Sequence, residues 1–246
     1  MEDIWKKILN ESEALSKDES IIKKVIDQTI NKKENFWISI AFILSNLLAN
    51  NYISQSELQT LISQILTKNT EIQTQIITDF KTYYERDFAC ETYIEVILFN
   101  RGFQAVTAYR IARYYYQNNQ KLTSKFFQNR IFDVFGMDIH PNAKLGQGIV
   151  IDHGIGLVIG ETAEIGDNAF IFHNVTLGGT GHKGGDRHPK IKNNVFIGAG
   201  ATILGNIVIN DNANIAAGSV VTKEVPENTT VAGIPAKVIG KAKKLQ

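Results

Sequence analysis

Aliphatic side chains recur every six residues between positions 139 and 221. The thirteen positions of this series are Ile139, Leu145, Ile151, Ile159, Ile165, Ile171, Leu177, Ile191, Ile197, Ile203, Ile209, Ile215 and Val221. This period matches neither the 3.6-residue period of a helix nor the two-residue alternation of an ordinary strand. It is typical of a parallel β-helix, in which each hexad forms a short strand and a corner and three hexads close one triangular coil. We therefore expect the leading aliphatics to stack inside a prism.

A second apolar residue, usually small, follows four positions after many of the leading aliphatics. Examples are Ala143, Ala163, Ala169, Val175, Val195, Ala201, Ala213 and Ser219. The series slips by two residues between Ile151 and Ile159, and it is interrupted at residues 178–190 by a glycine-rich segment that contains Asp186, Arg187 and His188. Such a segment is either a mobile surface loop or a functional one, and a charged loop beside a rigid scaffold favours function.

The first half of the chain has the pattern of α-helices. Apolar residues recur at three- and four-residue spacing, proline is absent before position 136, and Gly102 is the only glycine there. Ser56 is a candidate N-cap for the helix that contains Leu58, Ile62 and Leu66. We expect an α+β chain of two domains, an α-helical oligomerisation domain at 1–135 and a β-helix catalytic domain at 136–246.

Composition excludes several classes of protein. The net charge is +1 and no basic stripe is present, so no nucleic-acid partner is expected. The apolar run that starts at Phe36 is interrupted by serine and asparagine and suits a buried helix better than a membrane span. The single cysteine, Cys90, is expected to be a buried small hydrophobe in a reducing compartment. With no signal-peptide pattern at residues 1–12, we expect a cytoplasmic protein without a membrane partner.

All five histidines fall in the repeat half. A zinc site needs about three imidazoles that converge on one point. His182 and His188 are six positions apart and lack a well-placed third ligand, so no metal is expected. His140 and His173 are single histidines in repeat corners, where a structural role is the usual one.

His153 differs because of its neighbours, Asp152 and Asp138. With eighteen residues per coil, Gly156 would lie directly above Asp138, and His153 precedes Gly156 by three positions. Adjacent coils are separated by about 4.8 Å, so a carboxylate at Asp138 would come within reach of the imidazole. Such a pair can activate a hydroxyl nucleophile, with histidine as the base and the carboxylate as its orienting partner. The alternative is that Asp138 only caps the first coil and His153 packs at a corner, and the spacing does not decide between the two.

At these residues the chain resembles the serine acetyltransferases of cysteine biosynthesis. The matching stretches are DIHPNAKLGQGIVIDHGIGLVIGETA, HNVTLGGTGHKGGDRHPKI, IGAGATILGN and AGIPAKVIG, together with FNRGFQAVTAYRIARYYYQ in the helical half. The resemblance implies a left-handed β-helix and acetyl transfer from acetyl-CoA to the hydroxyl of L-serine in a ternary complex, giving O-acetyl-L-serine and CoA.

The resemblance also implies roles for particular residues. His153 would be the catalytic base and Asp138 its orienting carboxylate. The ammonium group of serine would bind Asp152 and Asp87, its carboxylate would bind Arg187, and His188 would sit beside the hydroxyl or the developing oxyanion. The candidates for close approach of acetyl-CoA are Gly179, Ala199 and Ala217.

The family further implies trimers, with sites between subunits, that pair into hexamers, and feedback inhibition by L-cysteine. The end of the sequence, KAKKLQ with Gln246 last, lacks the tail with which longer members bind cysteine synthase, so that complex is not expected. Two other functions stay open: an O-acyltransferase that acts on homoserine or a sugar, and a catalytically silent trimeric scaffold. Asp152 and Arg187 favour an amino-acid acceptor. The joint presence of Asp138, His153, Arg187 and His188 counts against a scaffold.

Overall fold

The computed structural model describes residues 2–18, 20–181 and 184–243, and the chain divides into two compact units, residues 1–100 and 101–246. The change from helix to strand falls where the sequence predicts it, because the last helix ends at Phe135 and the first strand begins at Asp138. The predicted boundary at 135/136 and the division into units nevertheless differ, since two helices after residue 100 belong to the unit that contains the β-helix.

The first unit is helical. Its elements are α1 (Glu2–Asp18), α2 (Ser20–Ile26), the π-helix η1 (Asp27–Asn31), α3 (Phe36–Leu48), α4 (Gln55–Lys68), α5 (Thr70–Arg86) and α6 (Tyr93–Leu98). The apolar run that starts at Phe36 forms α3 and is largely buried. None of the described helices has both the length and the apolar character needed to cross a bilayer.

The N-cap predicted at Ser56 is wrong by two residues. The cap of α4 is Ser54, whose hydroxyl accepts a hydrogen bond from the Glu57 backbone, while the Glu57 carboxylate accepts one from the Ser54 backbone. This reciprocal capping box satisfies two N–H groups at the start of the helix. Ser56 instead lies inside the first turn of α4, where its carbonyl accepts from the Thr60 hydroxyl at 3.0 Å.

Cys90 is half-buried rather than buried. Its thiol donates to the Thr92 carbonyl at 3.3 Å. Burial, reinforced by the negative charges of Glu95 and Asp87, raises the pKa of the Cys90 thiol to about 11. The thiol is therefore protonated near neutral pH and is a poor nucleophile.

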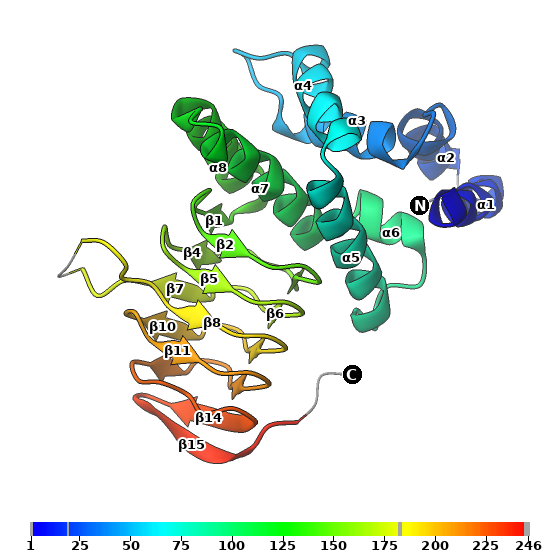
Figure 1. Cartoon of the computed structure of the whole chain (residues 1–246). Helices are drawn as coiled ribbons and strands as arrows, with labels where there is room; N and C mark the ends of the chain where they lie inside the picture. Colours follow the sequence, from blue (N-terminus) through cyan, green and yellow to red (C-terminus); the bar gives the residue numbers. More distant parts are fainter. Residues whose placement is uncertain (1, 19, 182–183, 244–246) are drawn as a thin grey trace. The chain divides into compact units, whose positions relative to one another are not determined.

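The second unit begins with α7 (Arg101–Gln117) and α8 (Lys121–Phe135), which pack against each other and lie next to the first coil of the β-helix (Figure 1). Buried side chains of α7 bind that coil through its backbone. The Tyr109 hydroxyl donates to the Ala143 carbonyl, Arg110 donates to the Gly146 carbonyl at 2.7 Å, and Arg113 donates to the Ala143 carbonyl at 2.8 Å. These bonds satisfy carbonyl groups that have no coil beneath them, which explains why both helices belong to this unit.

The β-helix has three parallel sheets whose strands follow each other around the prism. Sheet A contains β1 (Asp138–Ile139), β4 (Val158–Ile159), β7 (Thr176–Gly178), β10 (Thr202–Leu204) and β13 (Val220–Val221). Sheet B contains β2 (Lys144–Leu145), β5 (Glu164–Ile165), β8 (Lys190–Ile191) and β11 (Val208–Ile209). Sheet C contains β3 (Val150–Ile151), β6 (Phe170–Ile171), β9 (Phe196–Ile197), β12 (Asn214–Ile215), β14 (Thr229–Gly233) and the antiparallel β15 (Ala236–Lys241). Figure 1 shows these coils stacked in order along the prism.

The predicted inner stack is confirmed. All thirteen leading aliphatics are buried, as are the small residues that follow four positions later. Strand register aligns the aliphatics from coil to coil, for example Ile151 with Ile171 and Ile171 with Ile197. The interior is therefore a close-packed column of Ile, Leu and Val.

The prediction that Gly156 lies above Asp138 is wrong. Asp138 pairs with Val158, and the Gly156 amide instead donates to the Gly136 carbonyl at 2.8 Å. The two-residue slip after Ile151 lengthens the first coil to twenty residues, so a count of eighteen falls short by two. The extra residues lie in the corner that holds His153.

Candidate active site

Two corners of the prism carry the predicted site residues. We name the corner between sheets C and A, which holds residues 152–157, the base corner. The corner between sheets A and B, which holds residues 160–163 and the glycine-rich segment, is named the loop corner. Sheet A separates the two corners within one chain.

His153 lies at the base corner with an unusual backbone. Its φ is +57°, whereas the other left-handed non-glycine residues in the described part of the β-helix are asparagines such as Asn168 and Asn174. Positive φ is uncommon for a residue with a side chain, and histidine, like asparagine, adopts it more readily than most. The imidazole is 71% exposed, and its Nε2 is 3.7 Å from a carboxylate oxygen of Asp152. The lengthened corner therefore presents both side chains to solvent.

A row of equivalent positions runs along the base corner and consists of Ile155, His173, Ala199 and Ala217. The backbone bonds define it, because Asn174 N donates to the Ile155 carbonyl as Gly200 N donates to the His173 carbonyl and Gly218 N to the Ala199 carbonyl. His153 lies in the two-residue insertion beside this row. The rings of His153 and His173 meet edge to face at 5.7 Å. His173 is thus followed along the row by two small residues.

Asp138 starts the first strand of sheet A, and its carboxylate accepts a hydrogen bond from the Gln128 amide of α8 at 2.6 Å. Among the described residues, no hydrogen bond joins Asp138 to His153. The nearest recorded carboxylate contact of His153 is the one with Asp152.

The loop corner holds Arg187 and His188 through two residues of the coil beneath. Arg187 Nη2 donates to Glu161 Oε2 at 2.9 Å, and the Arg187 backbone donates to Thr162 Oγ1 at 3.0 Å. His188 Nδ1 lies 2.9 Å from Thr162 Oγ1 and accepts from the Thr162 backbone at 3.2 Å. Gly179, a predicted contact of acetyl-CoA, lies beside the side chain of Arg187, since a Cβ there would be 3.3 Å from Arg187 Cγ.

The His188 ring covers Gly160. A Cβ at position 160 would lie 2.0 Å from the ring, so only glycine leaves room for it there. The residue is 6% exposed. Burial and the positive charge of Arg187 lower the pKa of His188 below its ordinary value. Near neutral pH this imidazole is therefore uncharged.

Two more titratable groups lie near this pair. The hydrogen bond from Arg187 lowers the pKa of the Glu161 carboxyl, which keeps that group ionised. Burial, followed by the charge of Lys125, lowers the pKa of His140, whose Nδ1 accepts from the Asn142 backbone at 3.1 Å. The loop corner thus combines an ion pair with two neutral imidazoles.

The C-terminal end of the glycine-rich segment is fixed to the prism. Lys190 Nζ binds the Asp186 carboxylate at 2.6 Å, and Asn206 donates to the same carboxylate at 3.2 Å. His182, one of the two histidines considered for zinc, lies outside the described residues. Within the part of the chain that the structure covers, no group of three or more His, Cys, Asp or Glu is arranged to hold a metal ion.

Asp152, His153, Arg187 and His188 are predicted from the sequence, whereas Glu161 and Thr162 are not. The signal for these two was present, since GETA occupies the corner one coil beneath the loop. Asp87 belongs to the other compact unit, where its backbone caps α5 and its carboxylate accepts from the Asn100 amide at 3.4 Å.

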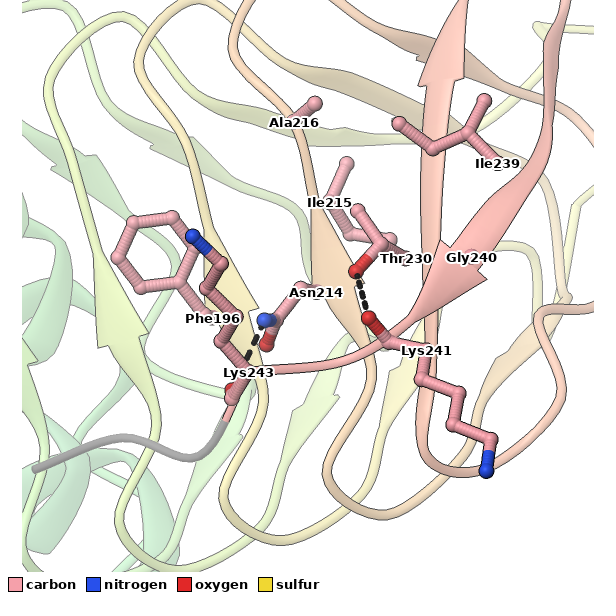
Figure 2. Close-up of a pocket in the computed structure, with 9 residues that line it drawn as sticks. All are labelled: Phe196, Asn214, Ile215, Ala216, Thr230, Ile239, Gly240, Lys241 and Lys243. Atoms are coloured by element: carbon pink, nitrogen blue, oxygen red, sulfur yellow. Dashed lines mark hydrogen bonds between the residues drawn. The ribbon is translucent and has the colours of Figure 1, made fainter.

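A cavity of about 340 Å³ lies on sheet C near the C-terminal end of the prism (Figure 2). It is lined by Phe196, Asn214, Ile215, Ala216, Thr230, Ile239, Gly240, Lys241 and Lys243. The Asn214 amide donates to the Lys243 carbonyl at 3.0 Å, which ties the chain after β15 across the cavity. Ala216 lines the cavity and immediately precedes Ala217, the last small residue of the row at the base corner.

Comparison with known proteins matches both halves of the chain. A family model of the serine acetyltransferase N-terminal domain matches residues 4–108, and a bacterial transferase hexapeptide model of six repeats matches residues 188–223. The serine acetyltransferase of Salmonella typhimurium is 40% identical over 241 residues, which are 98% of this chain and 88% of that protein.

Solved structures agree over nearly the whole length. Serine acetyltransferase from Brucella abortus in complex with coenzyme A has a TM-score of 0.95 at 39% identity and covers 98% of this chain and 97% of its own. Serine acetyltransferase from Neisseria gonorrhoeae in complex with serine has a TM-score of 0.92 at 44% identity, with coverage of 95% and 96%. The predicted left-handed β-helix is confirmed by this likeness. The chain belongs to the serine acetyltransferase family.

Proposed function

We propose that this protein transfers the acetyl group of acetyl-CoA to the hydroxyl of L-serine, giving O-acetyl-L-serine and CoA, the first step of cysteine biosynthesis from serine. The observation that carries the proposal is the pairing of an exposed imidazole beside a carboxylate at the base corner with an arginine and a neutral imidazole at the loop corner. Serine needs a base for its hydroxyl and one anchor of each charge, and the two corners supply them. The relatives bound to coenzyme A and to serine support both substrates.

His153 acts as the general base in this proposal. It removes the proton of the serine hydroxyl as the oxygen attacks the thioester carbon, the C–S bond breaks, and the proton passes to the CoA thiolate. A positioned base of this kind is typically worth about 10²–10⁴ in rate. Asp138 orients the imidazole and stabilises its charged form. For that role its carboxylate turns from the Gln128 amide toward His153 when substrate is bound.

Charged groups of opposite sign hold the amino acid. Asp152 and Asp87 bind the ammonium group, and Arg187 binds the carboxylate, to which its planar fork is suited. His188 lies beside the reacting oxygen. Serine attacks acetyl-CoA directly in a ternary complex, without a covalent enzyme intermediate, which fits the protonated state of Cys90.

A complete site requires two chains. His153 and Arg187 lie on different corners of one prism, with sheet A between them. In a closed ring of identical subunits, one surface of each chain meets a different surface of the next. A trimer therefore joins the base corner of one chain to the loop corner of its neighbour, and the N-terminal helical domains pair two trimers into a hexamer.

Acetyl-CoA runs along the base corner. Ala199 and Ala217 occupy the same row as His173, whose ring contacts that of His153, so their small side chains leave a track that leads toward the base. The cavity of Figure 2 adjoins the far end of this track through Ala216, and the ammonium groups of Lys241 and Lys243 suit the phosphates of CoA. Gly179 allows close approach at the loop corner. L-Cysteine, which has the same charged groups as serine, binds the serine site and inhibits.

The first experiment measures thiol release from acetyl-CoA with L-serine, L-homoserine or no acceptor. The test variant is His153→Asn, because asparagine occupies the same left-handed conformation at other corners of this prism. We expect serine-dependent release that falls about 10²–10⁴-fold in the variant. Asn212→His, a left-handed corner position away from both site corners, is the matched control and should keep full activity. Preference for homoserine would contradict the acceptor, and no release from folded oligomer would contradict the reaction.

A second experiment tests the shared site. His153→Asn and Arg187→Ala are each expected to be inactive as homotrimers. Random mixed trimers should regain about one quarter of wild-type activity, because a quarter of the interfaces combine an intact base corner with an intact loop corner. A site built within a single chain would show no recovery.

A further inference from the structure

Thr162 lies in the coil beneath Arg187 and His188 and binds both. We propose that Thr162 is a positioning residue that fixes His188 in the tautomer protonated on Nε2, so that His188 donates a hydrogen bond to the reacting oxygen and cannot be the base. This inference deepens the proposed function and rests on it for the identity of the substrate. The assignment of the tautomer itself depends only on the contacts around Thr162.

The hydroxyl of Thr162 has one proton and two lone pairs. Its oxygen accepts from the Arg187 backbone at 3.0 Å and from the His188 backbone at 3.2 Å, so both acceptor positions are occupied. The remaining capacity of the hydroxyl is its proton, which has two acceptors within reach, His188 Nδ1 at 2.9 Å and the Asp186 carboxylate.

The Thr162 backbone gives an independent constraint on the same ring nitrogen. Its N–H donates to His188 Nδ1 at 3.2 Å. A backbone N–H has no acceptor capacity, so Nδ1 must present a lone pair. Nδ1 therefore accepts from the Thr162 backbone, and the proton of the neutral ring resides on Nε2.

The position of Nε2 suits a hydrogen-bond donor to a bound substrate. This atom lies over Gly160, where a Cβ would approach it to 2.1 Å, and no hydrogen bond to it is formed by the residues that the structure describes. The lowered pKa of His188 keeps the ring neutral near neutral pH. A neutral Nε2–H close to the reacting oxygen stabilises negative charge there, and a donor of this kind is worth about 10²–10³ in rate.

The consequence is a division of labour between two histidines. His188 keeps its proton and donates a hydrogen bond, whereas His153, whose imidazole has no second donor fixed on it by a neighbouring coil, accepts the proton of serine. Thr162 also tethers the backbone of residues 187 and 188, so the guanidinium of Arg187 and the ring of His188 are placed by a single side chain.

The decisive measurement is solid-state ¹⁵N NMR of the sedimented full-length protein with labelled histidine, which is insensitive to the size of the assembly. His188→Ala identifies the His188 signals by their loss. We expect a protonated Nε2 and an unprotonated Nδ1 for His188 in the wild-type protein without substrate. A proton on Nδ1 would overturn the proposal, and this test requires neither activity nor any substitution at Thr162.

Kinetics supply the second arm. Thr162→Val removes the hydroxyl at nearly constant shape, so the backbones of Arg187 and His188 lose their acceptor while the backbone N–H of residue 162 still donates to Nδ1. The tautomer should therefore persist, whereas KM for serine should rise and kcat/KM should fall by about 10²-fold, as expected for a displaced catalytic constellation. Thr162→Ser keeps the hydroxyl and should restore both kinetic constants. If Thr162→Val leaves the kinetics unchanged, the positioning role is wrong. If the wild-type protein fails to acetylate serine but shows the expected tautomer, the failure lies in the proposed function.

Discussion

Gly154, which follows His153, is a position where alanine should be poorly tolerated. Its φ is +74°, and a Cβ there would lie 2.1 Å from Met137 Cε and 2.8 Å from Ile151 Cγ2. Left-handed backbone costs an alanine about 1–2 kcal/mol. Met137 and Ile151 are fully buried, so room for a methyl group must come from displaced core atoms, which typically costs about 1–3 kcal/mol. We expect Gly154→Ala to reduce the free energy of unfolding by about 2–5 kcal/mol.

Two other glycines separate the contributions. Gly218 has φ +68° with open space around it, so Gly218→Ala should cost only the backbone contribution of about 1–2 kcal/mol. Gly240 has open space and an ordinary φ, so Gly240→Ala should be neutral or slightly stabilising. The three variants therefore form a graded series with one added cost at each step.

Thermal unfolding at a fixed protein concentration measures the series, because stability of an oligomer depends on concentration. For a chain of this size 1 kcal/mol corresponds to about 2–4 °C in Tm, so Gly154→Ala should melt roughly 10 °C below the wild-type protein. Equal Tm values for Gly154→Ala and Gly218→Ala would show that the packing contribution is absent. A Tm equal to that of Gly240→Ala would refute the backbone conformation as well.

Three more predictions concern the site. Glu161→Gln should raise KM for serine more than it lowers kcat, because the variant loses the ion pair that holds Arg187; steady-state kinetics with Glu164→Gln as the control checks this. The pKa of Glu161 is lowered in the folded protein. The stabilisation that its ion pair with Arg187 gives is therefore fully present above the ordinary glutamate pKa, and it is lost as pH falls through the lowered pKa. KM for serine should therefore rise only at acidic pH, and that rise should be missing in Glu161→Gln. The double variant Lys241→Ala/Lys243→Ala should raise KM for acetyl-CoA and leave KM for serine unchanged; equal changes in both would argue against a phosphate contact at the cavity.

The inner stack could be predicted from sequence because the period of six leaves each leading aliphatic no other place than the interior. The alignment between coils could not be predicted from that period alone. The two additional residues after Ile151 lengthen the first coil from eighteen to twenty residues. A count of eighteen therefore places Asp138 beneath Gly156, whereas it lies beneath Val158. Small irregularities in a repeat thus shift every neighbour relation across the coil that contains them.

The roles of Thr162 and Glu161 could not be predicted from periodicity for a different reason. Their roles arise from hydrogen bonds to a segment about twenty-five residues later, and those bonds depend on how the glycine-rich segment returns to the prism. Neither residue type is unusual at a corner, so periodicity carries no trace of their function. Only resemblance to a family, by marking GETA and GGDRHPKI together, connects the two stretches.

The lengthened corner between Ile151 and Ile159 has a consequence for protein engineering. Both ends of the insertion are inner-stack positions in normal register with the next coil, so the two additional residues change the rim of the prism without altering its interior. A catalytic corner of this form can be moved as a unit. Transplanting residues 152–158 into another coil should move the imidazole along the axis by whole coil spacings of about 4.8 Å. The distance between base and acyl donor then becomes a discrete design variable, selected by the choice of coil.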